Sequence, residues 1–156
     1  ARELWVLGTA LIVLAIFLYL AERLSPRNRD IKQLSFLQIQ FIGLTQALAL
    51  IPGCSRSGST IMGGLLVGLN RESAARFSFL LGLPAIFGSG LYELKELIEL
   101  GISSDGYLNL VVGIAAAFVT GYLSIALLLR FLRNHGTLVF VIYRIVLGAG
   151  ILILLV

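Results

Sequence analysis

A polar, glycine-rich segment, residues 52–60, interrupts an otherwise apolar part of the chain. Apolar runs flank the segment on both sides, at residues 36–51 and 61–69. The segment carries Arg56, and an arginine at the depth of a bilayer costs about 3 kcal/mol or more. Irregular backbone is tolerated at that depth only where protein buries it or where it lines a wet cavity. The rest of the chain must therefore fold so as to shelter this segment.

The composition is that of a membrane protein. Of the 156 residues, 58% are apolar, and the mean hydropathy is +0.99, which soluble domains rarely reach. Because no alternating strand pattern occurs, we predict an all-α integral membrane protein with one transmembrane domain, residues 1–156. The net charge is +4, without the clustering of basic and aromatic residues that is typical of nucleic-acid binding. A single cysteine, Cys54, excludes an intrachain disulfide and a cysteine-rich metal site.

Charge and length predict how the chain crosses the bilayer. The expected spans are residues 4–21, 74–100, 107–132 and 138–156. Basic residues gather in two connecting segments, 22–34 and 130–135, which the positive-inside rule places in the cytoplasm. The connection at residues 101–106 has no basic residue and is expected outside. Pro84 is expected to break or kink the second of these spans.

Residues 36–69 are predicted to form a re-entrant helix–loop–helix with the polar segment at its tip. The second arm, residues 61–69, would be only about 14 Å long as a helix and cannot span a bilayer. Pro52 disfavours helical geometry at the residue before it and so ends the first arm. The sides assigned to the charged connections are consistent with one another only if residues 36–69 enter and leave the membrane by the same face. The longer first arm would carry the tip past the midplane, towards the outer side.

The residue types at the tip suit a phosphate group. Ser59 or Thr60 is expected to cap a helix that begins near Ile61, and the unpaired N–H groups of its first turn would attract an anion. Arg56 offers a planar fork of donors that matches phosphate oxygens. Further hydroxyls and permissive backbone come from Gly53, Ser55, Ser57 and Gly58. The order of residues is not that of a Walker A loop. The alternative is a packing or selectivity loop in which Arg56 pairs with a carbonyl group.

Few other polar side chains lie within the apolar segments. Gln46 shares a helix face with Gln38 and Thr45, and this face is expected to meet protein or water rather than lipid. Arg144 lies inside the last span and needs a partner or a cavity. His135 is expected at a wet helix end rather than in catalysis. Because no carboxylate or histidine is expected near Arg56, chemistry alone leaves open a transporter or channel for an anionic or lipid-phosphate substrate, or a packing unit.

The tip also resembles the signature of a known family. Its order Pro-Gly-x-Ser-Arg-Ser-x-x-Thr, residues 52–60, is similar to that of the undecaprenyl-diphosphate phosphatase (bacitracin-resistance) family. The resemblance continues through Gly64, Arg71 and Pro84 and returns at residues 142–144. An earlier motif of the family, with paired glutamates, two serines and a histidine, is absent here. The chain therefore resembles the C-terminal half of such an enzyme, one half of an inverted-repeat fold.

The resemblance implies a function and a set of site residues. The family hydrolyses undecaprenyl diphosphate to the monophosphate and so recycles the lipid carrier of cell-wall synthesis, at the outer face of the bacterial plasma membrane. It implies catalytic roles for Ser55, Arg56 and Thr60. The expected substrate-binding residues are Gln46, Gly53, Ser57, Gly58 and Ser59. The resemblance also implies a Mg²⁺ or Ca²⁺ ion, for which this chain shows no ligands. It further implies a partner, which is either the missing N-terminal half or a second copy of this chain.

Overall fold

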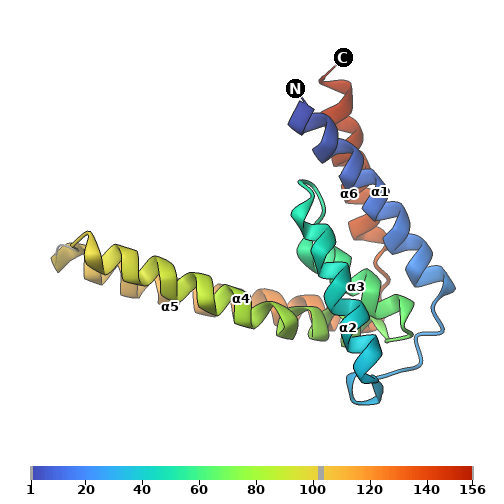
Figure 1. Ribbon diagram of the computed structural model, residues 1–156, viewed down its shortest axis with the longest axis horizontal. Helices are drawn as coiled ribbons and strands as arrows, with labels where there is room; N and C mark the ends of the chain where they lie inside the picture. Colours follow the sequence, from blue (N-terminus) through green and yellow to red (C-terminus); the bar gives the residue numbers. More distant parts are fainter. Residues whose placement is uncertain (1, 102–103, 156) are drawn as a thin grey trace.

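The computed structural model describes residues 2–101 and 104–155, and this part of the chain consists of helices joined by short loops (Figure 1). The helices in chain order are α1 (Arg2–Leu24), α2 (Phe36–Thr45), α3 (Arg56–Leu66), α4 (Arg71–Glu99), α5 (Ser104–Asn134) and α6 (Leu138–Ile153). Two short 3₁₀ helices, η1 (Ile31–Gln33) and η2 (Gln46–Leu50), lie on either side of α2. The described residues contain no β-strand, which confirms the all-α prediction.

The helices pack side by side in pairs (Figure 1). Helices α1 and α6, from opposite ends of the chain, run side by side. Helices α2 and α3 form a hairpin that packs on α1 through α3. Helices α4 and α5 form a second, longer hairpin that projects away from the rest of the molecule. Within the described residues, three helices are long and apolar enough to cross a membrane, at Leu4–Leu24, Arg71–Glu99 and Gly106–Asn134. The chain is therefore an all-α membrane protein.

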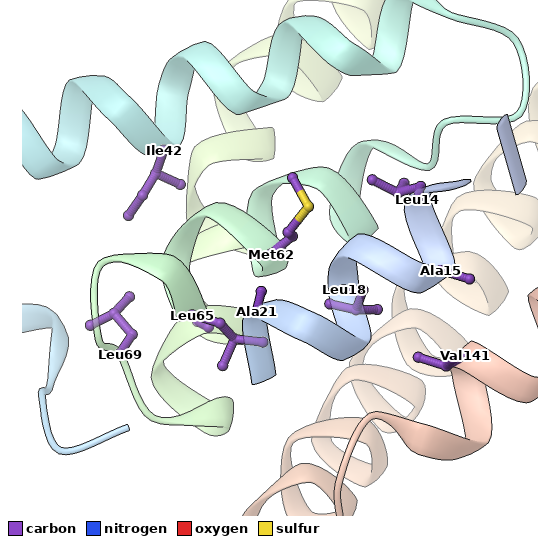
Figure 2. Close-up of a cluster of buried hydrophobic side chains, with 10 residues drawn as sticks. Leu14, Ala15, Leu18, Ala21, Ile42, Met62, Leu65, Leu69 and Val141 are labelled. Carbon is purple, nitrogen blue, oxygen red and sulfur yellow. The ribbon is translucent and has the colours of Figure 1, made fainter. Parts of the chain in front are cut away.

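A small apolar core joins α3 to the surrounding helices (Figure 2). Leu14 and Leu18 of α1 face Met62 and Leu65 of α3, and Ile42 of α2 closes the other side. Close backbone approach adds to this packing: a Cβ atom on Gly148 of α6 would come within 2.8 Å of the Gly8 carbonyl oxygen of α1. Such small-residue contacts allow helices to pack tightly where lipid gives no hydrophobic drive for association. The core fixes the position of α3 and therefore of the polar segment that precedes it.

Several helix boundaries differ from those expected from sequence. Helix α3 begins at Arg56 with Ser55 as its N-cap, so the prediction of a cap at Ser59 or Thr60 and a start near Ile61 was wrong. The chain reverses at Pro52 and Gly53, and the Gly53 φ of 94° is one that glycine adopts readily. Ser55 is the first serine after this turn, and it caps α3. The helix thus takes up half of the polar segment.

The expected break at Pro84 is also absent, because α4 runs continuously from Arg71 to Glu99. Leu80, whose carbonyl group would bond to the N–H group that proline lacks, is exposed on the surface of α4. A proline inside a membrane helix is tolerated where neighbouring groups or local adjustments compensate for the lost bond. The first arm of the central hairpin changes instead, from α-helix to 3₁₀ helix at Gln46.

Candidate functional site

The candidate site is built at the N-terminus of α3. The Ser55 hydroxyl accepts a hydrogen bond from the Gly58 N–H group at 3.2 Å, which caps the helix. The Ser59 N–H group donates to the Ser55 carbonyl oxygen at 2.9 Å. Among the described residues, no hydrogen-bond acceptor meets the N–H groups of Arg56 and Ser57. This end of the helix therefore presents two free donors and the positive end of the helix dipole.

Arg144 reaches this helix end from α6. Its Nη2 atom donates to the Gly53 carbonyl oxygen at 2.8 Å. Its Nη1 atom lies beside Gly58, since a Cβ atom added there would be 3.5 Å from it. Its Nε atom is buried and meets no acceptor within the described residues. The expected partner of Arg144 is thus the loop before α3, and the Arg144 guanidinium group lies at the candidate site in addition to that of Arg56.

Arg56 points in a different direction from Arg144. Its guanidinium group packs against α4 at Gly82, so closely that a Cβ atom at this position would overlap it. The Arg56 Nη1 atom is buried there and finds no acceptor in the described part of the chain. Gly82 therefore provides the space that this charged group occupies. An unpaired, buried guanidinium nitrogen is costly, and a bound anion would supply the missing acceptor.

A cavity of about 240 Å³ opens beside the helix end. Its polar lining comes from Ser55, Ser57, Gly58, Tyr143, Arg144 and Thr137, and its apolar lining from Leu18, Ile61, Leu128, Leu132 and Phe140. Donors are therefore gathered in part of a cavity whose remaining walls are apolar. This combination suits a molecule with an anionic head and a hydrocarbon tail.

The other predicted site residues, Arg56 and Gly53 among them, do not line this cavity. The Thr60 hydroxyl is buried, bonded to the Arg56 carbonyl oxygen at 2.9 Å and to the Ser78 hydroxyl at 2.6 Å. Ser59 is fully buried, and its hydroxyl has no partner among the described residues. Gln46 begins η2, and its Oε1 atom is buried and equally unpaired in that part of the chain. Their roles towards substrate stay predictions.

Acidic groups are engaged elsewhere. Glu22 accepts hydrogen bonds from Arg71 and Thr137, and Glu72 accepts two from Arg133. No group of three or more His, Cys, Asp or Glu side chains that could hold a metal ion occurs among the described residues. Magnesium and calcium prefer carboxylate oxygens, and the Mg²⁺ or Ca²⁺ ion that the family resemblance implies stays a prediction.

Comparison with known proteins identifies the family. The family described as "Bacitracin resistance protein BacA" matches residues 1–150. The chain belongs to this family. Curated relatives named "Undecaprenyl-diphosphatase" include one from Synechococcus elongatus, 50% identical over 151 residues, which cover 97% of this chain and 52% of that protein. The relative from Thermomicrobium roseum is 50% identical over 143 residues, 92% of this chain and 51% of that protein.

These BacA relatives are longer than this chain. A third, from Chlorobaculum tepidum, is 46% identical over an alignment of 162 positions, which covers 99% of this chain and 57% of that protein. The chain thus spans about half the length of the curated relatives that it matches. Their shared name is that of a phosphatase, so the transporter or channel alternative is not favoured. The residues around Arg144 could have been assigned to the site from sequence, since the resemblance returns at residues 142–144.

Proposed function

We propose that this chain forms the phosphate-binding part of a membrane phosphatase that converts undecaprenyl diphosphate to undecaprenyl phosphate. The observation that carries the proposal is the meeting of Arg144 with the capped N-terminus of α3, beside a cavity with apolar walls. A diphosphate would take the free N–H groups and the guanidinium donors. The hydrocarbon tail would continue along the apolar lining. The names of the relatives point to the same substrate.

The reaction is the hydrolysis of a phosphoanhydride. Water adds to the terminal phosphorus, the bond from that phosphorus to the bridging oxygen breaks, and the lipid monophosphate leaves. Charge spreads over the phosphoryl oxygens in the transition state, and positioned cationic donors stabilise it. Arg144 and Arg56 are the cations of this chain that fit such a role. Thr60 would act indirectly, because its bond to Ser78 ties the first turns of α3 to α4.

The proton-accepting group must come from elsewhere. General base catalysis needs a group within hydrogen-bond reach of the attacking water, directly or through one further water. Ser55 is an unactivated nucleophile, since within the described residues its hydroxyl meets only the Gly58 N–H group and the Ser57 hydroxyl, each at 3.2 Å. We therefore infer that the other half of an inverted-repeat enzyme, or a second copy of this chain, supplies the base. The same region would supply the ligands of a Mg²⁺ or Ca²⁺ ion, which would neutralise charge on the diphosphate.

The place of the reaction is part of the proposal. We assign the protein to the bacterial plasma membrane, with the loop before α3 directed towards the outer face. The support is the basic character of the connections at residues 22–34 and 130–135, which the positive-inside rule assigns to the cytoplasm. The product would then be released in the outer leaflet, where recycling of the carrier begins.

Phosphate release from undecaprenyl diphosphate tests the proposal. The chain alone should release no phosphate above background, with or without magnesium, and co-expression with the first half of a relative should restore turnover. In the restored enzyme, Arg56→Ala should abolish most activity. If the activity of this variant stays within a factor of about three of the wild type, Arg56 contributes under about 1 kcal/mol of transition-state stabilisation, which is too little for a phosphate-binding role.

A further inference from the structure

A second cluster of arginines lies outside the site beside α3. Arg27 follows the end of α1, Arg71 begins α4, and Arg133 lies near the end of α5. The three side chains line one cavity of about 530 Å³, together with a single carboxylate, Glu72. A cavity of this size accommodates a small ligand. Leu132, only 2% exposed, lines both this cavity and the one beside α3, and so lies between them.

Ion pairs with carboxylates fix the side chains of two of these arginines, Arg71 and Arg133. The Glu22 Oε1 atom accepts from the Arg71 Nε atom at 2.5 Å, and Glu22 is itself fixed by the Thr137 N–H group at 2.8 Å. Glu72 accepts hydrogen bonds from the Nε and Nη2 atoms of Arg133, each at 2.8 Å. These pairings leave both terminal nitrogens of Arg71 and the Nη1 atom of Arg133 without an acceptor among the described residues.

Arg27 is the least neutralised member of the cluster. Its Nη1 atom is 3.8 Å from Glu22, beyond hydrogen-bond distance, and no acceptor in the described part of the chain meets its side chain. Its φ of 51° is unusual for a residue with a Cβ atom, and such a conformation persists only where the surrounding structure enforces it. The backbone N–H group of Arg27 donates to the Ser25 hydroxyl at 3.2 Å. The loop thus holds this charge at the cavity.

The cluster has more positive than negative charge. Three guanidinium groups face two carboxylates, Glu22 and Glu72, and Arg76 adds a further cation at 3.3 Å from Glu72. Guanidinium forks match the geometry of phosphate oxygens, and a phosphate group offers enough acceptors for several of them at once. A second cavity of about 280 Å³ shares Arg27 and Arg71 and includes Tyr19 and Leu138, so apolar surface adjoins the charged groups.

We propose that Arg27, Arg71 and Arg133 form a second phosphate-binding site, separate from the one beside α3. Its ligand is the phosphate group of an anionic lipid or free phosphate. Both carry the same oxygen acceptors, but a lipid would also lay its acyl chains beside Leu138 and Tyr19. An occupant here would join the ends of α1, α4 and α5, which ion pairs link at this point.

Native mass spectrometry of the purified protein in neutral detergent tests the lipid source. We expect phosphatidylglycerol to be retained at least about tenfold better than phosphatidylcholine with the same acyl chains, because phosphatidylglycerol has a net negative charge whereas the choline ammonium group offsets the charge of the phosphate in phosphatidylcholine. Arg27→Asn should remove this preference, and asparagine accepts the positive φ. Arg130→Gln is the matched control, because this exposed arginine of α5 does not line the cavity.

Thermal unfolding with inorganic phosphate tests the other source. A rise in Tm with millimolar phosphate that Arg27→Asn loses and Arg130→Gln keeps would assign the site to free phosphate, and Arg133→Gln should behave as Arg27→Asn does. Arg144→Gln, which alters only the site beside α3, should keep the part of each response that Arg27→Asn removes. The proposal is overturned if Arg27→Asn and Arg130→Gln respond alike to phosphatidylglycerol and to phosphate, or if Arg144→Gln alone removes the responses.

Discussion

Gly82 provides a sharp test of whether the position of Arg56 matters for activity. An added Cβ atom at Gly82 would overlap the Arg56 guanidinium group, so Gly82→Ala must displace that group. Alanine is favoured over glycine inside a helix by up to about 1 kcal/mol, which offsets the crowding, so the protein should remain folded. A misplacement of about 1 Å in a catalytic constellation can cost roughly 100-fold in rate, equivalent to about 2.7 kcal/mol of transition-state stabilisation.

The matched control lies six residues further along the same helix. Gly88 has no atom within 4 Å of an added Cβ, so Gly88→Ala changes helix propensity without moving Arg56. Both variants are assayed for phosphate release from a polyprenyl diphosphate in the enzyme restored by co-expression with the first half of a relative, and for thermal unfolding. We expect Gly82→Ala to lose roughly 30- to 100-fold in kcat/KM while Gly88→Ala stays near wild type, with both proteins folded. Equal activity of the two variants would refute the argument that Arg56 must occupy this position.

Four further predictions concern the same loop and its topology. Arg56→Lys keeps the charge but loses the planar fork, so we expect a loss of about 2–4 kcal/mol of transition-state stabilisation; kcat/KM near wild type would contradict it. Arg144→Gln removes the donor to the Gly53 carbonyl oxygen and should weaken inhibition by pyrophosphate by at least about tenfold; an unchanged inhibition constant would exclude Arg144 from the site. Cys54, half-buried beside this loop, should react with a small membrane-permeant maleimide, and more slowly when pyrophosphate is bound. Cysteines introduced at Asn28 and Asn70 should both react from the cytoplasmic side, and labelling from opposite faces would disprove the re-entrant hairpin.

Much of the fold could be predicted from local sequence signals. Apolar runs and polar connections predicted the helices, and the lone charge of Arg56 between apolar runs marked the region of the site. The start of α3 was misplaced because it depends on the reversal at Gly53, whose positive φ is a property of the folded backbone. Local preference favours several serines equally as caps. Only the folded chain distinguishes Ser55 from Ser59.

The contacts between distant segments could not be predicted from helix periodicity, although the family resemblance at residues 142–144 was one signal for Arg144. Arg144 was expected to need a partner, but a periodic apolar helix does not indicate which loop it will meet. Gly82 carried no signal at all, since glycine is common in membrane helices and its role depends on the guanidinium group opposite it. Both findings require the packing of α3 against α4 and the approach of α6, which depend on side-chain shape rather than on pattern.

The pairing of α1 with α6 has a consequence for how the protein is made. Gly8 and Gly148, which touch across this pair, are separated by 140 residues of chain. At a synthesis rate of about 5–20 residues per second, α1 must wait roughly 7–28 s before its partner emerges. During that interval Glu22 lacks the Thr137 donors that later fix it. Until α6 is made, α1 therefore lacks this packing partner, and the Glu22 carboxylate lacks the donors that later hold it.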